Sequence, residues 1–355
     1  MRVASALVAS LFLLLSSATG CERTTLALVQ RAGAANMNAD RVRDSVDGLT
    51  VVLCGAGSPL PDPERSGPCT AVIAGRHLFI FDAGSGASRQ LAALQIPQGR
   101  IDAIFLTHFH SDHIDGLGEL LLQRWVGGTR TEPTPIHGPT GVERVVAGFN
   151  EAYAQDKVYR VAHHGEKTVP PGGQGGRALP FAPPPDGHGE VVLDEDGVKV
   201  TAFAVDHTPV FPAVGYRIDY KGRSVVLSGD TARSPNLERF AKGVDLLVHE
   251  ALSPKLVETM TGIARAAGRD NLVKITQDIL TYHTSPVDAA KSAQAAGAKH
   301  LLFYHIVPAL PLAPMERIFL DGVSDAYDGP VTLGRDGTLV RMPAGSDAVE
   351  VEELL

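Results

Sequence analysis

The sequence has few of the features that mark nucleic-acid-binding, membrane-spanning or repeat proteins. Its 355 residues carry a formal net charge of −8 and contain no block of basic residues. This argues against broad electrostatic binding to nucleic acid, which needs Lys and Arg to displace counterions. No period of about 20 to 50 residues repeats, which argues against a solenoid or a propeller. The apolar run at residues 3–15 is too short to span a bilayer comfortably.

The N-terminal residues predict export. Met1 and Arg2 precede the apolar run, and small residues follow at 16–20, which is the order of a secretory signal peptide. Cys21 comes next, so the segment resembles a bacterial lipoprotein cleavage site, where the cysteine receives lipid. We expect residues 1–20 to be a signal peptide, residues 21–47 a flexible tether, and the protein to be periplasmic. Any contact with a membrane would be through a lipid on Cys21, and an uncleaved N-terminal anchor is the alternative. Loss of residues 1–20 removes Arg2 and changes the net charge from −8 to −9.

Two of the three cysteines form a candidate pair. If Cys21 carries lipid, Cys54 and Cys69 remain, near the ends of two predicted strands. In an oxidising compartment they can form a disulfide, which would stabilise the fold by roughly 3 kcal/mol. Two buried thiols are the alternative.

The pattern of apolar runs predicts one α/β domain over residues 48–343, followed by a C-terminal tail at 344–355. The composition, 44% hydrophobic and 20% charged, is enough for a full core. The segment at residues 170–189, rich in Pro and Gly, is interpreted as a surface loop. Strands are predicted at residues 49–54, 69–74, 77–81, 101–107, 135–139, 198–206, 213–220, 224–228, 246–249 and 300–304, with a closing hairpin of residues 330–333 and 338–342. Helices are predicted at residues 88–94, 114–125, 141–153 and 286–296.

The run His108-Phe109-His110-Ser111-Asp112-His113 is the strongest functional signal. It packs three imidazoles and a carboxylate into six residues, directly after an apolar strand. These are ligands that zinc and similar metals accept. In an extended segment His108 and His110 point the same way and can hold one ion, while Asp112 and His113 are offset and can begin a second cluster. The alternative is a polar loop with incidental histidines.

Further candidate ligands stand where predicted strands end. They are His207, Asp230, with Gly229 beside it, and His305. A single histidine after a strand is more often a hydrogen-bonded loop residue. The three together favour a metal site at one rim of the sheets.

These motifs resemble the metallo-β-lactamase superfamily, in the branch typified by ribonuclease Z, phosphodiesterases and arylsulfatase-like hydrolases. The matching segments, nearly spanning the domain, are H-x-H-x-D-H at 108–113, Asp206-His207, Ser228-Gly229-Asp230-Thr231, His249-Glu250, His283-Thr284-Ser285 and His305. Gly55-Ala56-Gly57-Ser58-Pro59 and Phe81-Asp82-Ala83-Gly84 also fit. The resemblance implies a four-layer αββα sandwich, in the α/β (α+β) class, with two metal ions.

The resemblance also implies a role for each residue. His108, His110 and His207 would hold one zinc ion, Asp112, His113 and His305 the second, and Asp230 would bridge them. Asp112 would orient a metal-bound hydroxide or accept its proton, and His283, supported by Glu250, would protonate the leaving group or stabilise the oxyanion. Zn²⁺ is the expected metal, with Mn²⁺ or Fe²⁺ as alternatives.

The expected substrate is a small phosphodiester or aryl sulfate ester. Only Lys221-Gly222-Arg223 stands where ribonuclease Z proteins of the bacterial type carry a long tRNA-clamping insertion. With the acidic charge and predicted export, this makes nucleic acid an unlikely partner. A ribonuclease Z-like endonuclease acting on RNA 3′ ends is the alternative, as is a lactone- or amide-cleaving hydrolase.

A non-catalytic module would have lost metal ligands, and all seven are present. Trp125, Phe149, Tyr153 and Tyr159 are candidates to stack on an aromatic leaving group, with core packing as the alternative. A homodimer is compatible with the resemblance.

Overall fold

The computed structural model describes residues 22–34 and 37–355, and the chain divides into two compact units, Met1–Arg41 and Val42–Leu355. In the first unit, residues 22–34 are helical, although the sequence predicted a flexible tether there. The predicted signal peptide and Cys21 lie outside the described residues. Among the described residues, no helix combines the length and the apolar character needed to cross a bilayer.

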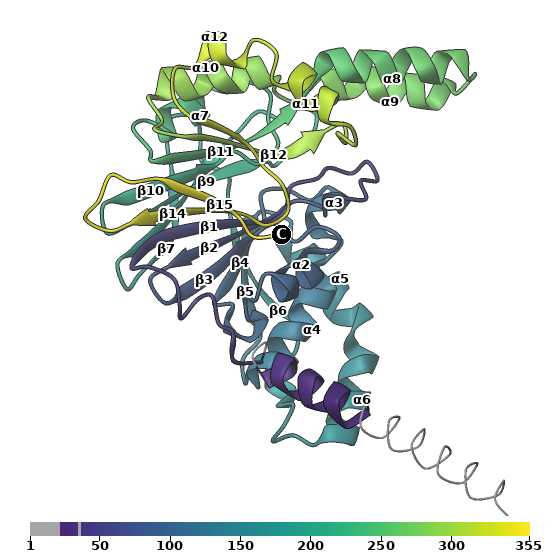
Figure 1. Cartoon of the computed structure of the whole chain (residues 1–355), viewed down its shortest axis with the longest axis vertical. Helices are drawn as coiled ribbons and strands as arrows, with labels where there is room; N and C mark the ends of the chain where they lie inside the picture. Colours follow the sequence, from purple (N-terminus) through teal and green to yellow (C-terminus); the bar gives the residue numbers. More distant parts are fainter. Residues whose placement is uncertain (1–21, 35–36) are drawn as a thin grey trace, which may run out of the picture. The chain divides into compact units, whose positions relative to one another are not determined.

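Two β-sheets form the centre of the second unit (Figure 1). One sheet has the strand order β15-β14-β1-β2-β3-β4-β5-β6, and the other has the order β13-β12-β11-β10-β9-β8-β7. The strands are β1 (Gly48–Gly55), β2 (Cys69–Ala74), β3 (His77–Phe81), β4 (Ala103–Phe105), β5 (Thr134–Pro139), β6 (Gly176–Phe181), β7 (Glu190–Glu195), β8 (Val198–Ala204), β9 (Val214–Tyr220), β10 (Arg223–Leu227), β11 (Leu246–Leu252), β12 (Leu301–Val307), β13 (Val331–Leu333), β14 (Thr338–Pro343) and β15 (Glu350–Glu353).

Helices connect these strands, and several of them cover the outer faces of the sheets. They are α2 (Ala87–Ala93), α3 (Ser111–Ile114), α4 (Leu117–Gly128), α5 (Val142–Ala152), α6 (Ala154–His164), α7 (Pro235–Phe240), α8 (Pro254–Ala266), α9 (Asp270–Asp278), α10 (Pro286–Ala296), α11 (Ala313–Phe319) and α12 (Val323–Ala326), with short 3-10 helices η1 (Gln98–Arg100), η2 (Pro171–Gly173) and η3 (Ile279–Thr281).

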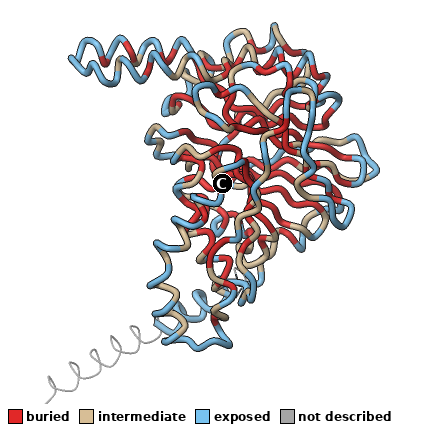
Figure 2. Tube along the Cα trace, turned by 180° about the vertical axis from the view of Figure 1, so that it is seen from behind, coloured by how far each residue is buried: buried red, intermediate tan, exposed pale blue. Residues whose placement is uncertain are grey.

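The hydrophobic core has three main layers of side chains. The central layer joins the facing sides of the two sheets, with Val51 and Phe105 from one sheet and Tyr216 and Val248 from the other. One outer layer packs α2, α4 and α5 against the first sheet. The other packs α7 and α10 against the second sheet. Figure 2 shows the buried trace along the strands and the exposed trace on α8 and α9. The four-layer αββα sandwich predicted from the sequence is therefore confirmed.

The helix α10 shows how local sequence sets the boundaries of an element. The Ser285 side chain accepts a hydrogen bond from Asp288 N at 3.1 Å, and Pro286 occupies the first turn, where its missing N–H costs nothing. Gly297 ends the helix in the left-handed region with φ of +63°. These bounds, Pro286–Ala296, are the ones that the sequence predicted.

Several predicted elements differ from the structure. The prediction of a closing hairpin is wrong, because β13 pairs with β12 in one sheet while β14 pairs with β1 in the other. The helix predicted at residues 114–125 is two helices, α3 and α4. The predicted loop at residues 170–189 contains β6, and the predicted C-terminal tail contains β15, which pairs antiparallel with β14. The helices α6, α7, α8, α9, α11 and α12 and the strand β7 were not predicted.

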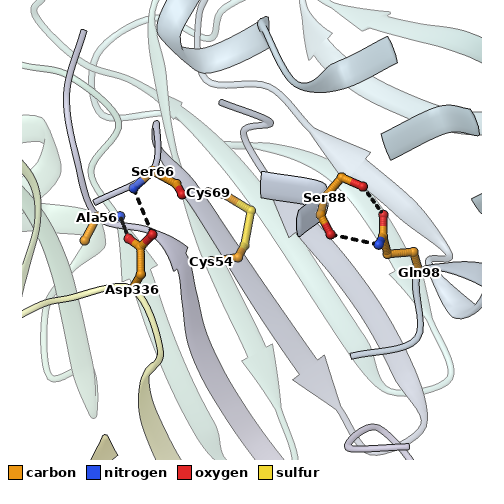
Figure 3. The surroundings of a disulfide bond; sticks show 7 residues. All are labelled: Cys54, Ala56, Ser66, Cys69, Ser88, Gln98 and Asp336. Atoms are coloured by element: carbon orange, nitrogen blue, oxygen red, sulfur yellow. Dashed lines mark hydrogen bonds between the residues drawn. A yellow bond between two sulfur atoms is a disulfide. The ribbon is translucent and has the colours of Figure 1, made fainter. Parts of the chain in front are cut away.

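Cys54 and Cys69 form a disulfide between the neighbouring strands β1 and β2 (Figure 3). The loop that it closes is anchored a second time by Asp336. The Asp336 carboxylate accepts hydrogen bonds from Ala56 N at 2.9 Å and from Ser66 N at 2.8 Å. The loop is thus fixed at both ends. Its residues 58–67 line a cavity that also borders Asp112.

Candidate metal centre

The predicted ligands come from four places in the chain. Three of these places lie after the end of a β-strand, and the fourth lies inside a strand near its end. His108 and His110 follow β4, and Asp112 and His113 belong to the short helix α3, whose first turn is closed by His113 N donating to His110 O. His207 follows β8, and Asp230 follows β10. His305 lies within β12 at a register shift, with φ of +45°.

The structure brings four of these side chains into one cluster. The ligand atoms of His108, His110, His207 and Asp230 all lie within 4.8 Å of one another. His110 Nδ1 lies 3.0 Å from His108 Nε2 and 3.4 Å from His207 Nε2. Three imidazole nitrogens facing one point at these distances form the ligand set expected for zinc.

Asp112, His113 and His305 form a second cluster with the same spacing limit of 4.8 Å. The Asp112 Oδ2 atom lies 3.5 Å from His113 Nε2 and 3.3 Å from His305 Nε2. Asp230 lies between the two clusters. Its Oδ2 atom is 3.3 Å from the Nε2 atoms of both His113 and His305, and 3.8 Å from His108 Nε2. This is the position that a bridging carboxylate requires.

The residues present fit divalent cations. His113 Nε2 and Asp230 Oδ1 are buried and have no hydrogen-bond partner within the part of the chain that the structure describes, which is costly unless another group binds them. Burial lowers the pKa of His108 well below its ordinary value and also lowers that of His207. Both imidazoles are therefore neutral, the form that ligates a metal.

His113 is surrounded by negative charge. Burial opposes its protonation, but the carboxylates of Asp230, Asp112 and Asp82 raise its pKa well above the ordinary value. Carboxylates around one buried imidazole attract positive charge, which a metal ion supplies as well as a proton does. The electrostatics therefore favour cation binding at the second cluster.

Neighbouring groups hold the ligand rings in place. Asp82 lies at the end of β3, and its Oδ2 atom is 2.8 Å from His113 Nδ1. The same carboxylate accepts hydrogen bonds from the backbone N–H and the hydroxyl of Thr107, whose oxygen is 3.1 Å from His108 Nδ1. Phe81-Asp82-Ala83-Gly84 is one of the segments that fit the family, but no role in the site was predicted for Asp82. Its position at the end of a strand, like those of Asp230 and His207, was the available signal.

Glu250 and His283 lie beside the clusters, as the resemblance implied. Glu250 Oε1 is 3.0 Å from His283 Nδ1 and accepts hydrogen bonds from the backbone N–H groups of Thr231 and Thr284. Burial opposes protonation of His283, but Glu250 raises the pKa of the imidazole to about 9. The His283 ring lies 5.5 Å from the His305 ring. His283 is therefore placed to hold a proton next to the ligand clusters.

A cavity of about 390 Å³ opens next to Asp112. It is lined by the loop at residues 58–67, by Ser111 and by Asp115. The four aromatic residues proposed to face a cleft do not line it. Trp125 is fully buried with its indole N–H donating to Pro170 O, and Tyr159 is 64% exposed on α6.

Comparison with known proteins shows the family. The sequence profile of the Metallo-beta-lactamase superfamily matches residues 62–291. Ribonuclease Z from Mycobacterium avium (strain 104) is 37% identical over 300 residues, which cover 84% of this chain and all of that protein. Ribonuclease Z from Mycobacterium bovis (strain BCG / Pasteur 1173P2) is 38% identical over 81% of this chain and 96% of that protein.

Solved structures share the fold. Human tRNase Z, short form, superposes with a TM-score of 0.58 at 23% identity and covers 83% of this chain and 99% of that one. The metallo-beta-lactamase fold protein YhfI from Bacillus subtilis also has a TM-score of 0.58, at 19% identity, over 82% of this chain and 99% of that one. At these identities the likeness shows the fold.

These relatives correct one expectation. Nucleic acid was considered an unlikely partner on the grounds of charge, predicted export and the short turn at Lys221. Relatives that are 37% identical over their whole length carry the name of a ribonuclease, so that conclusion is wrong. Net charge describes only the overall electrostatic contribution to binding. It does not show whether a few well-placed groups at a site bind nucleic acid. The profile match and the two relatives establish that the chain belongs to the metallo-β-lactamase superfamily of metal-dependent hydrolases, in the branch that contains ribonuclease Z.

Proposed function

We propose that the protein is a zinc-dependent endoribonuclease of the ribonuclease Z type, with two metal ions, that cleaves RNA near 3′ ends. The similarity to Mycobacterium avium ribonuclease Z, at 37% identity across the whole of that protein, carries the proposal. The convergence of seven candidate ligands at one rim supports it, because two adjacent cations suit in-line displacement at phosphorus. Manganese or iron would fit the same ligand types.

His108, His110 and His207 would hold one ion, Asp112, His113 and His305 the other, and Asp230 would contact both. Bound divalent cations supply Lewis-acid stabilisation of charge on the attacking and leaving oxygens. The protein contributes the remaining steps. Asp112, at the edge of the 390 Å³ cavity, orients the attacking water and accepts its proton. His283, bonded through Nδ1 to Glu250, has Nε2 available to protonate the leaving oxygen.

We also propose that the protein acts outside the reducing cytoplasm. The disulfide between Cys54 and Cys69 supports this location, because disulfides persist in oxidising compartments. The apolar residues 3–15 and the small residues before Cys21 support it independently as a signal for export.

Hydrolysis of small phosphodiesters is the second candidate. The strands β9 and β10 are joined by a tight turn at Lys221 and Gly222, with Tyr220 paired to Arg223. No clamping insertion for a large RNA is present at this turn. A site that reaches phosphodiesters without such a clamp would also accept small ones.

The test is cleavage of a 5′-labelled precursor tRNA transcript with a 3′ trailer by the purified full chain at physiological salt. We expect one cleavage position, loss of activity with chelator, and recovery on addition of zinc. Asp230→Ala should lose metal and activity together, whereas Asp194→Asn, an exposed acid on β7, should keep both. Intact RNA together with cleavage of bis-p-nitrophenyl phosphate would favour the second candidate and contradict the first. p-Nitrophenyl sulfate tests the aryl sulfate hydrolysis that the sequence predicted and the comparisons do not support.

A further inference from the structure

We propose that a pocket between the loops that follow β8 and β10 binds one unpaired nucleobase of the RNA substrate, with Phe211 as its stacking surface. The proposal rests on the proposed ribonuclease function. The pocket has a volume of about 400 Å³, within the usual size range of small-ligand sites. Its lining includes Asp186, Asp206, Phe211, Arg233 and Arg239.

The pocket is built from the same two loops that carry the candidate metal ligands His207 and Asp230. One wall is formed by residues 204–206 and Phe211, and this loop also carries the candidate ligand His207. The opposite wall begins at Arg233, three residues after Asp230. The two walls are joined by Ala232 N donating to Asp206 O at 2.7 Å. A nucleotide in this pocket therefore lies beside the loops that position the reacting phosphate.

Hydrogen bonds fix the frame of the pocket. The Asn236 side chain accepts from Gly187 N at 2.9 Å and donates to Ala204 O at 2.8 Å, which links α7 to the loop before β7 and to the end of β8. Asp206 Oδ1 accepts from the hydroxyl of Thr208 at 2.8 Å. Arg233 pairs with Glu238 at 2.9 Å. These groups are used by the protein itself and give a preformed site.

Three side chains in the pocket, those of Asp186, Phe211 and Arg239, make no such contact within residues 22–34 and 37–355. Phe211 is 82% exposed, the largest exposed fraction of any large hydrophobic side chain in residues 42–355. Arg239 has no ion-pair partner among the described residues. Its guanidinium packs closely against Gly187, where an added Cβ would lie 2.5 Å from Arg239 Nη1. An isolated exposed apolar residue needs no explanation, but one that lines a charged pocket beside a metal centre does.

The chemistry of the lining suits a nucleobase. An aromatic ring offers a stacking face that every base can use. Arg239 can donate hydrogen bonds to the carbonyl or ring-nitrogen acceptors of a base, and Asp186 can accept from its amino or imino groups. The mixture of two carboxylates and two guanidinium groups matches a base edge better than a phosphate, which the carboxylates of Asp186 and Asp206 would repel.

The test measures kcat and KM for the labelled precursor tRNA transcript with the wild type, Phe211→Ala, Phe211→Trp and Tyr159→Ala. Stacking on one aromatic side chain predicts an increase in KM of about tenfold for Phe211→Ala, with little change in kcat, and recovery in Phe211→Trp. Tyr159→Ala removes a similarly exposed aromatic side chain on α6 and should behave as the wild type. Metal content and thermal stability of each variant check that the fold is retained.

Each outcome decides between the proposals. Wild-type cleavage with an unchanged KM in Phe211→Ala overturns the nucleobase pocket and leaves the ribonuclease function intact. A fall in kcat that Phe211→Trp does not restore indicates a structural role for Phe211 and also overturns the pocket. A wild-type protein that leaves the RNA intact overturns both proposals.

Discussion

The Asp82 carboxylate lies 2.8 Å from Nδ1 of His113, on the side of the imidazole away from the candidate metal position. Both side chains are almost completely buried. This contact fixes which nitrogen of His113 faces the cluster, because a proton on Nδ1 leaves the Nε2 lone pair for a metal. Asp82 itself has φ of +58° and is held by two hydrogen bonds from Thr107. The carboxylate is therefore a rigid support for the ring.

Replacing Asp82 with Asn should weaken metal binding. The amide is neutral and a poorer acceptor, so the ring loses both its orientation and part of its basicity. We expect a decrease of about 10- to 100-fold in metal affinity, the usual range for such supporting contacts. Competition with a chromogenic chelator measures it, and Asp194→Asn on β7 is the matched control. Unchanged affinity in Asp82→Asn would show that His113 is positioned by other groups.

His283 should affect turnover without affecting metal content. Its Nδ1 is bonded to Glu250, and it is assigned to protonation of the leaving oxygen. His283→Ala is expected to lower kcat by about 100-fold or more, the range for loss of a general acid. Two metals per chain should remain by mass spectrometry. Loss of a metal in this variant would instead make His283 a ligand, since it also lies within 4.8 Å of atoms of Asp230 and His305.

Local sequence was enough to predict the candidate ligands. His108, His110, His207 and Asp230 lie within five residues after a strand, and Asp112 and His113 lie on the short helix that follows the first of these strands. The apolar run before His108 predicts a strand. Ligands at strand ends converge when the strands end at the same rim of the two packed sheets, here β4 of one sheet and β8, β10 and β12 of the other. The supporting role of Asp82 was not predicted, although its segment fits the family, because that role depends on β3 lying parallel to β4, which places Asp82 beside Thr107. No spacing within the sequence reports that pairing.

The closing hairpin failed for a related reason. Two short strands joined by Gly334-Arg335-Asp336-Gly337 fit the usual hairpin pattern. In the structure these residues cross from one sheet to the other, and Asp336 binds Ala56 N and Ser66 N far away in the chain. The pairing of β13 with β12 and of β14 with β1 is decided by tertiary packing and not by the turn.

The disulfide should contribute measurably to stability. Cys54 and Cys69 are separated by 15 residues. In the chain-entropy model, a closed loop of this length contributes about 3 kcal/mol. The double change Cys54→Ser and Cys69→Ser should therefore lower the free energy of unfolding in urea by about that amount, and reductant should destabilise the wild type only. Labelling of both thiols in denatured, unreduced wild type would contradict the prediction.

His137 should make the protein sensitive to moderate acid. Its ring stacks on Phe105 at 4.7 Å, and burial, followed by the charge of Arg177, lowers its pKa from 6.5 to about 4. Between these values the unfolded chain binds a proton that the folded protein does not, so stability rises with pH through this window and is lost as the pH falls. His137→Phe keeps an aromatic ring but cannot take up the proton. Its free energy of unfolding, measured by urea titration from pH 7 to pH 4, should therefore fall less than that of the wild type.

His164→Phe, at the exposed end of α6, is the control and should follow the wild type. Parallel loss of stability in wild type and His137→Phe would mean that other groups set the acid limit.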